Sequence, residues 1–487
     1  MKKLTTLLLL LVCTFTFAQQ FKVSYTASDF KGPFTGKVFL YLSKENKSPK
    51  DGYVGLTSYP CYAIDVQNIK PGETVIFDDK AKSYPVKLTD IERGEYYVQA
   101  VWDRNLGGRA INESPGNIYN IATQVNISQN RETVFNLSCS ETNPQKTFVD
   151  TEFIKELKVN STLLSKFHNK EMTVDAAIIL PKEYYTQPNR KFPVLFRISG
   201  FGGDYHNLSN NENIKSQPID TIACITVYLD GNCSLGHSVY TNSDNNGPWG
   251  DALTKEFIPN FEKKYRTNGA KLLTGHSSGG WTVLSLQTRY PEVFDGCWSS
   301  APDVVDFRDY QGVDLYDGEN MLYTEDGTQR SVATVAGRFP WISSKQMYSM
   351  ENIISRGEQI NSLDAVFGPK GVDGKPERIC DPITGVMNPQ AFEHWKKYDI
   401  SLYLRNNWTS LKKNLEGKIR VSVGNQDNFL LNGAVHKLEE AMQPLNTNFQ
   451  FEYFPGDHFT IFTPEYEEKG NAFLARRYAA WETKHGK

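Results

Sequence analysis

Three features that mark other classes of protein are missing from this sequence of 487 residues. Basic residues are not in excess, because 53 Lys and Arg stand against 56 Asp and Glu, and the formal net charge is −3. No apolar run approaches the ~20 residues of a membrane-spanning helix. The seven cysteines include no close Cys-x-x-Cys pair of the zinc-binding kind. We therefore expect no nucleic-acid partner, no membrane span and no bound metal.

The first part of the chain has the three-part pattern of a secretory signal. Met1-Lys2-Lys3 precedes an apolar run from Leu7 to Val12, and Thr16-Phe17-Ala18 supplies the small residue at the end. We expect a signal peptide over residues 1–18, cleavage after Ala18, and a secreted or periplasmic protein. Cys13 also allows a lipoprotein interpretation, although Val12 is larger than the residue that usually precedes such a cysteine.

The six cysteines after the signal are widely and irregularly spaced. An even number in an exported chain is compatible with one or two disulfides, and Cys224 with Cys233 is the nearest candidate pair. The remaining chain is long enough for two or three domains, each of which buries its own core.

Short segments of alternating apolar and polar residues, broken by turn residues, fill the chain to about residue 140. This period-two pattern predicts a small immunoglobulin-like antiparallel β-sandwich over residues 19–140, followed by a linker over residues 141–150. Structural support of the rest of the chain is the simplest role for it, and polymer binding or substrate positioning are the alternatives. The expected strands are 21–25, 36–42, 74–77, 94–102 and 133–137.

From residue 151 to 487 the pattern changes to strands alternating with amphipathic helices. This order is typical of an α/β domain with a doubly wound, mostly parallel sheet covered on both faces. The expected strands are 174–180, 192–198, 222–229, 419–424 and 449–454. We expect a helix from Asp251, as its N-cap, to about Tyr265, and a last helix over residues 464–481.

One motif in this region carries chemistry. Gly275-His276-Ser277-Ser278-Gly279 stands between an apolar strand and a helix. Gly-x-Ser-x-Gly at such a junction is typical of a nucleophile elbow, in which a strained turn lifts the serine hydroxyl off the sheet. Ser277 is therefore the candidate nucleophile, and the backbone N–H of Ser278 a candidate oxyanion donor. A plain glycine- and serine-rich loop is the alternative.

A serine nucleophile needs a histidine base and an acid that orients it, both from loops at the same edge of the sheet. His458 follows the last expected strand and is the candidate base. Asp427 follows the penultimate strand and is the candidate acid, with Asp303 after an earlier strand as the rival. If Asp303 is not the acid, it is a candidate substrate contact or a residue that holds its loop.

The second oxyanion donor should come from the loop Ser199-Gly200-Phe201-Gly202-Gly203, because its glycines let backbone N–H groups approach a substrate oxygen. We assign the donor to Phe201, with the neighbouring Gly202 as the alternative. Trp249 stands in the loop Asn246-Gly247-Pro248-Trp249 and is a candidate substrate-binding residue. The alternative is that Trp249 packs in the hydrophobic core.

The run from about Ser165 to His458 resembles the esterase family of the α/β-hydrolase fold. That family contains esterase D (S-formylglutathione hydrolase), feruloyl and acetyl xylan esterases, enterochelin esterases and the antigen 85 mycolyltransferases. The motifs that carry the resemblance are Gly200-Phe201-Gly202-Gly203, Gly275-His276-Ser277-Ser278-Gly279-Gly280, Gly424-Asn425-Gln426-Asp427 and Gly456-Asp457-His458-Phe459. The resemblance implies a Ser277, His458 and Asp427 triad, an oxyanion hole from Phe201 and Ser278, and no cofactor.

The chain departs from the family pattern in two places. Ser199-Gly200 stands where the family more often has His-Gly or Asp-Gly. About a hundred residues, roughly 304–411, separate the elbow half from Asp427, and so long a connection is typical of a lid or binding insert. Trp341, Trp395 and Trp408 in this insert are candidates to line a pocket or to pack in the core.

We expect a secreted serine carboxylic-ester hydrolase with an acyl-enzyme intermediate, acting on a small-molecule or polysaccharide ester. A carbohydrate-linked acetyl or feruloyl ester is the first candidate substrate, and a siderophore ester is the second, both from the resemblance. An acyltransferase of the antigen 85 type would use the same triad. A non-catalytic carbohydrate-binding protein is the alternative from another class, and the complete set of catalytic residues argues against it.

Overall fold

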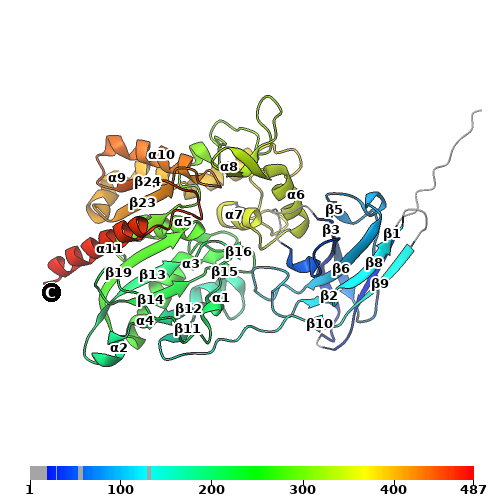
Figure 1. Cartoon of the computed structure of the whole chain (residues 1–487), viewed down its shortest axis with the longest axis horizontal. Helices are drawn as coiled ribbons and strands as arrows, with labels where there is room; N and C mark the ends of the chain where they lie inside the picture. The colour runs from blue at the N-terminus through cyan, green and yellow to red at the C-terminus, as the bar shows by residue number, and fades with distance from the viewer. Residues whose placement is uncertain (1–18, 29, 53–58, 129–132, 487) are drawn as a thin grey trace, which may run out of the picture. The chain divides into compact units, whose positions relative to one another are not determined.

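The computed structural model describes residues 19–28, 30–52, 59–128 and 133–486 (Figure 1). The expected signal peptide and Cys13 lie outside these residues. Contacts divide the chain into two compact units. The first holds the strands up to Asn143, and the second holds everything from Pro144 onward. Residues 105–115 belong to the second unit, although the strands on either side of them belong to the first.

The first unit is built from two β-sheets, one of three strands and one of seven. Its strands are β1 (Gln19–Tyr25), β2 (Phe34–Ser43), β3 (Cys61–Ile69), β4 (Val75–Phe77), β5 (Lys82–Tyr84), β6 (Gly94–Asp103), β7 (Ile118–Tyr119), β8 (Thr123–Ile127), β9 (Thr133–Cys139) and β10 (Glu141–Thr142). The smaller sheet has the order β4-β1-β9. Its β1 and β9 pair in parallel, so the expectation of purely antiparallel strands was wrong at this edge. A parallel neighbour needs a long connection, which the chain between the two strands supplies.

A mixed sheet of eight strands forms the centre of the second unit, in the order β11-β12-β14-β13-β19-β20-β23-β24. These strands are β11 (Ile154–Asn160), β12 (Thr173–Ile179), β13 (Phe192–Ile198), β14 (Ile225–Leu229), β19 (Thr267–His276), β20 (Gly296–Ser300), β23 (Ile419–Gly424) and β24 (Gln450–Phe454). The pairs β11–β12 and β12–β14 are antiparallel, and every pair from β14 to β24 is parallel. The prediction of a mostly parallel α/β sheet is confirmed.

Helices cover this sheet, as Figure 1 shows. The helices of the second unit are α1 (Thr162–His168), α2 (Glu183–Thr186), α3 (Trp249–Asp251), α4 (Ile258–Lys264), α5 (Ser278–Arg289), α6 (Ser344–Ile354), α7 (Gln359–Phe367), α8 (Pro389–Trp395), α9 (Ile400–Leu415), α10 (Leu431–Met442) and α11 (Pro464–Lys484), of which α6, α7 and α8 lie away from the sheet (Figure 1). Both α5 and α11 pack against β19 and β20, and α9 packs on α5 and α10. Short two-stranded sheets are formed by β15 (Asn232–Cys233) with β16 (Gly236–His237), β17 (Asn242–Ser243) with β18 (Gly247–Pro248), and β21 (Ser331–Val335) with β22 (Phe339–Ser343).

Two expected elements have different bounds in the structure. The helix expected from Asp251 begins at Trp249 and continues through a π-helical segment, Ala252–Phe257, into α4. Asp251 is therefore not its N-cap. The Asp251 carboxylate instead accepts a hydrogen bond from the Tyr290 hydroxyl at 2.9 Å. The strand expected from residue 222 begins at Ile225, because the two residues Ile219 and Ile222 pair with each other in a tight turn.

The chain between β20 and β23 holds β21, β22, α6, α7, α8 and α9. Its last helix, α9, belongs to the helical layer of the sheet, since it packs on α5 and α10. Trp395 is buried among Phe307, Tyr310 and Phe367, and Trp408 is also buried. Trp341 is exposed. Trp395 and Trp408 therefore pack in the core, whereas Trp341 does not.

The cysteines of the described residues form no disulfide bonds. All six cysteines of the described residues are free and buried, so the pairing of Cys224 with Cys233 was wrong. The Cys224 thiol instead donates to the carbonyl oxygen of Gln217 at 3.4 Å.

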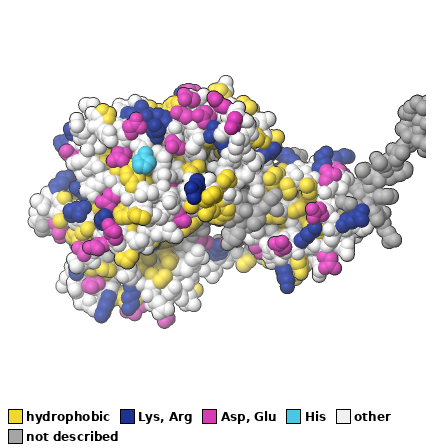
Figure 2. Space-filling model, turned by 45° about the horizontal axis from the view of Figure 1, so that its top comes forward, with side chains coloured by type: hydrophobic (Ala, Val, Ile, Leu, Met, Phe, Trp, Pro, Cys, Tyr) yellow, Lys and Arg dark blue, Asp and Glu magenta, His cyan; other side chains and the backbone are white. Residues whose placement is uncertain are grey.

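On the face drawn in Figure 2, Lys and Arg side chains are interspersed with Asp and Glu side chains. Within the described ranges, no helix is both long enough and apolar enough to cross a bilayer.

Candidate active site

Ser277 occupies the sharp turn between β19 and α5. Its backbone angles are φ 59° and ψ −127°, a conformation that non-glycine residues rarely adopt. The Ser277 N–H donates to the carbonyl oxygen of Ser300 at 3.0 Å, which holds the turn against β20. A Cβ atom at Gly275 would press on the Gly279 carbonyl, and one at Gly279 would press on the Ile198 carbonyl. The turn therefore needs glycine on both sides of the serine.

His458 and Asp427 meet at the carboxyl ends of the last two strands. The parallel strands β23 and β24 lie side by side, and the loops after them carry Asp427 and His458. His458 Nδ1 lies 2.7 Å from Asp427 Oδ2, and both side chains are buried, at 3% and 0% exposure. The N–H of Phe429 donates to Asp427 Oδ1 at 2.9 Å. These bonds assign the proton of the imidazole to Nδ1 and leave Nε2 as an acceptor.

A second imidazole lies against that of His458. The ring centroids of His276 and His458 are 4.4 Å apart, and the Phe429 ring stands perpendicular to His458 at 4.9 Å. Burial lowers the pKa of His276 to about 3, so this ring is neutral near pH 7. His276 Nδ1 forms a 3.0 Å hydrogen bond with the Ser300 hydroxyl, which in turn contacts the Tyr466 hydroxyl. His276 therefore packs beside His458 without adding a positive charge.

Asp303 lies directly beside the two serines of the elbow. The Ser277 hydroxyl donates to Asp303 Oδ1 at 3.4 Å, and the Ser278 hydroxyl donates to Asp303 Oδ2 at 2.5 Å. Burial raises the pKa of the Asp303 carboxyl. Among the described residues, Asp427 forms the hydrogen bond to His458, and Asp303 accepts the hydrogen bonds from the Ser277 and Ser278 hydroxyls. The geometry thus separates two aspartates that the sequence left as rivals.

The loop after β13 runs close to Ser277. A Cβ atom at Gly200 would lie 3.3 Å from the Ser277 Cβ and 3.2 Å from the His276 carbonyl oxygen, tighter than an ordinary contact. Gly202 has a φ of +83°, which favours glycine. Phe201 lies between these glycines, and Ser278 opens α5, where the first N–H groups have no partner within the helix. Both expected oxyanion donors are thus on the edge of the sheet that holds Ser277.

Arg109 is a residue of this site that the sequence did not indicate. Its guanidinium group lies 4.6 Å from the centroid of the Phe201 ring, and it donates to the Gly357 carbonyl oxygen at 2.8 Å. Arg356 holds the same segment by donating to the carbonyl oxygens of Gly108 and Arg109, at 2.8 and 3.1 Å. Nothing local could have indicated Arg109, because the segment 105–115 lies between two strands of the other unit.

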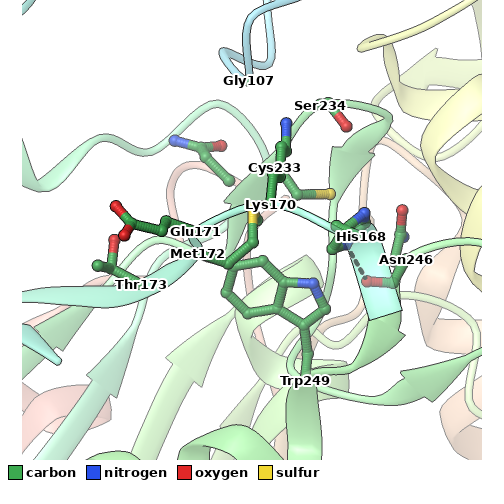
Figure 3. A pocket seen from close by; sticks show the side chains of 11 residues that line it. Gly107, His168, Lys170, Glu171, Met172, Thr173, Cys233, Ser234, Asn246 and Trp249 are labelled. Atoms are coloured by element: carbon green, nitrogen blue, oxygen red, sulfur yellow. Dashed lines mark hydrogen bonds between the residues drawn. The ribbon is translucent and has the colours of Figure 1, made fainter. Parts of the chain in front are cut away.

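Trp249 is packed in the core of the second unit. It is 4% exposed, and its ring meets the edge of Tyr240 at 5.9 Å. It lines a cavity of about 150 Å³, shown in Figure 3, whose lining does not include Ser277, Asp427 or His458. The structure therefore brings together all of the predicted site residues except Trp249. No three His, Cys, Asp or Glu side chains of the described residues are arranged to hold a metal ion.

Several solved structures match about two thirds of this chain at low sequence identity. A ferulic acid esterase matches at 14% identity and a TM-score of 0.38, covering 68% of this chain and 98% of its own. An S-formylglutathione hydrolase from Agrobacterium tumefaciens matches at 13% identity and a TM-score of 0.39, covering 67% and 96%. Est1E from Butyrivibrio proteoclasticus matches at 14% identity and a TM-score of 0.36, covering 66% and 99%.

The sequence itself matches a protein family over more than half of its length. The match covers residues 165–463 and is to the family described as "Putative esterase". Curated protein sequences give no match. The matched residues include the elbow, the loop with Phe201, and the loops with Asp427 and His458. The chain therefore belongs to the esterase family and is a carboxylic ester hydrolase.

Proposed function

We propose that this protein is an exported serine esterase that cleaves acetyl or feruloyl esters linked to carbohydrate. Ser277 is the nucleophile, His458 the base and Asp427 the acid of the triad. The observation that carries the proposal is the 2.7 Å bond between His458 Nδ1 and Asp427 Oδ2 at the strand ends beside the elbow. That bond leaves His458 Nε2 free to accept a proton from a serine hydroxyl.

The reaction proceeds in two halves. Ser277 Oγ attacks the ester carbonyl while its proton passes to His458 Nε2, and the resulting imidazolium protonates the leaving alcohol. Water, deprotonated by the same His458, then attacks the acyl-serine and releases the acid. The Ser277 hydroxyl must turn from Asp303 toward His458 for the first step. Hydrogen bonds of free active sites often tighten only when substrate is bound.

The oxyanion that forms in each half accepts hydrogen bonds from the Phe201 and Ser278 N–H groups. One donor of this kind is worth ~2.7–4 kcal/mol in the transition state. The cation over the Phe201 ring adds positive charge to this loop. No organic cofactor takes part in these steps, because the chain supplies the nucleophile, the base and the donors.

The substrate class is supported by the family resemblance, since that family contains feruloyl and acetyl xylan esterases. The test is hydrolysis of p-nitrophenyl acetate, methyl ferulate and acetylated xylan by the wild type and by Ser277→Ala. We expect the variant to lose activity by about a million-fold. Ser410→Ala, on the exposed side of α9, is the matched control and should be fully active. Activity kept by folded Ser277→Ala would contradict the triad. If the wild type cleaves neither acetylated xylan nor methyl ferulate, the proposed substrate class is wrong.

Export is supported by the charged, apolar and small-residue pattern of residues 1–18. N-terminal sequencing of the protein recovered from the periplasm or the medium should give Gln19 as its first residue. Protein that stays in the cytoplasm and still begins at Met1 would contradict the proposed export.

A further inference from the structure

The loops after β13 and β14 are joined to each other by one buried carboxylate. Because β13 lies parallel to both β14 and β19, these loops leave the sheet at the edge where Ser277 lies. Asp230 is the first residue after β14 and is 7% exposed. Its Oδ2 accepts a hydrogen bond from the Tyr205 N–H at 3.0 Å, and its Oδ1 accepts one from the Asn232 N–H, also at 3.0 Å. Each carboxylate oxygen therefore holds one of the two loops.

The side chain of Asn232 adds a second link between the same loops. Its Nδ2 donates to the carbonyl oxygen of Gly203 at 2.7 Å, two residues before Tyr205. Asp230 and Asn232 come this close together because Gly231 between them has a φ of +68°, which glycine adopts without strain. The three hydrogen bonds, two to the Asp230 carboxylate and one from the Asn232 amide, form what we call the Asp230–Asn232 bridge.

The turn that carries Phe201 ends at this bridge. The Gly203 N–H donates to the Gly200 carbonyl oxygen at 3.1 Å, so residues 200–203 form a β-turn with Phe201 at its second position. Gly202, at the third position, has a φ of +83°, which is typical of a type II turn. The position and direction of the Phe201 N–H therefore depend on where Gly203 is held, and the Asp230–Asn232 bridge holds Gly203.

An oxyanion donor is effective only if it is fixed in place before the reaction, and misplacement by about 1 Å can cost on the order of 100-fold in rate. Burial raises the pKa of Asp230 to about 6, so above that pH the carboxyl is ionised and both of its oxygens accept. We propose that Asp230 and Asn232 are positioning residues for ester hydrolysis, because their bridge holds the turn that presents the Phe201 N–H to the oxyanion. The inference rests on the proposed function, in which Phe201 is an oxyanion donor.

Two single substitutions each break one bond of the bridge. In Asp230→Asn the amide keeps one acceptor oxygen, but its NH₂ faces the N–H of either Tyr205 or Asn232, so one bond is lost. In Asn232→Leu the Gly203 carbonyl loses its donor. Loss of a whole oxyanion donor costs about 10²- to 10³-fold in kcat, and a displaced donor should cost part of that. We expect each variant to lower kcat for p-nitrophenyl acetate by about 5- to 50-fold with little change in KM, because the donor acts on the transition state.

Two further measurements separate positioning from a merely structural role. Ser277 Oγ adds to the carbonyl carbon of 1,1,1-trifluorohexan-2-one, the serine proton passes to His458, and the ketone oxygen becomes an oxyanion like that of the reaction. The inhibition constant of this ketone should rise by about the factor by which kcat/KM falls. The double variant of Asp230→Asn with Asn232→Leu should lose less than the product of the two single losses, because both act through one turn.

Asp295→Asn is the matched control. Asp295 immediately precedes β20, at the end of that strand away from Ser277, and its Oδ2 accepts from the Lys271 N–H at 3.0 Å. Burial raises the pKa of this carboxyl as well. Its kcat and its inhibition by the ketone should equal those of the wild type. Circular dichroism and thermal unfolding show which variants are folded, and Asn232→Leu, which keeps its backbone bond to Asp230, provides the test if Asp230→Asn does not fold.

The proposal is wrong if the folded bridge variants keep the kcat of the wild type, if they raise only KM, or if Asp295→Asn loses as much activity as they do. Ser277→Ala, measured in parallel, separates this failure from a failure of the proposed function. Activity kept by Ser277→Ala would contradict the triad, whereas an inactive Ser277→Ala beside fully active bridge variants would contradict only the positioning role.

Discussion

Replacing Asp427 by asparagine should abolish most of the activity through the tautomer of His458. Asp427 Oδ1 accepts hydrogen bonds from the N–H groups of Phe429 and Leu431, at 2.9 and 3.4 Å. In Asp427→Asn the amide oxygen is held at this position, so the amide NH₂ faces His458 Nδ1. Two donors cannot face each other, and the imidazole proton therefore moves to Nε2. His458 then has no lone pair with which to accept the Ser277 proton.

The expected loss follows from that change of tautomer. In a serine protease triad the same substitution costs ~10⁴-fold in kcat, or about 5 kcal/mol of transition-state stabilisation. We expect a similar fall in kcat for p-nitrophenyl acetate, with little change in KM, because Asp427 is buried behind His458 and does not contact the ester. Stopped-flow measurement of the acylation burst would locate the loss in the step in which Ser277 is deprotonated.

Asp303→Asn is the matched control. An asparagine at this position keeps an oxygen that accepts from the Ser277 hydroxyl, while its NH₂ can donate to Ser278. The exchange of a charged for a neutral acceptor costs about 1 kcal/mol, so activity should fall less than ~10-fold. If Asp427→Asn keeps a tenth of the activity, or if folded Asp303→Asn loses as much as Asp427→Asn, the assignment of the acid is refuted.

Three further predictions concern other parts of the second unit. Arg109→Met should lower kcat by about 3- to 30-fold while thermal unfolding changes little, because a cation over Phe201 contributes ~0.5–2 kcal/mol to holding the oxyanion loop; an unchanged kcat would contradict it. Gly279→Ala should lower the unfolding temperature and the yield, because its Cβ would overlap the Ile198 carbonyl; a variant as stable as wild type would show that the turn has room. Burial raises the pKa of Glu351 to about 8, so the stability it contributes is present below pH 4.5 and lost as the pH rises through 8. The unfolding free energy of Glu351→Gln in urea should thus improve relative to wild type between pH 5 and 8.5, and a constant difference would contradict the shifted pKa.

The parts of the site that the sequence predicted are those set by local pattern and by the geometry of parallel strands. The elbow needs small residues around Ser277 because backbone carbonyls crowd it, and that requirement is visible as glycines in the sequence. Parallel strands point their carboxyl ends to one edge, so residues directly after β19, β23 and β24 had to lie near one another. Strand ends therefore indicated Ser277, Asp427 and His458 without any distance being known.

Contacts between distant segments left no comparable signal. Arg109 contacts Phe201 from the segment 105–115, which belongs to the second unit but lies in the sequence between strands of the first. Neither the composition nor the spacing of this segment distinguishes it from an ordinary loop. Trp249 shows the converse, because its local sequence suggested an exposed site that the fold does not provide. An aromatic residue in a glycine- and proline-containing loop suggests an open pocket, but the same loop turns into α3 and buries the ring. Exposure depends on what packs above a residue, which local sequence does not encode.

The choice between Asp303 and Asp427 marks the limit of reasoning from strand ends. Their strands, β20 and β23, are neighbours in the sheet, so both carboxyl groups arrive at the same edge. What separates them is the direction of each carboxylate. The Phe429 and Leu431 N–H groups hold one Asp427 oxygen and turn the other toward His458 Nδ1, whereas the elbow hydroxyls take both oxygens of Asp303. Backbone N–H groups two and four residues after Asp427 decide this direction. The proposed acid is therefore distinguished by the loop that follows it and not by its position after a strand.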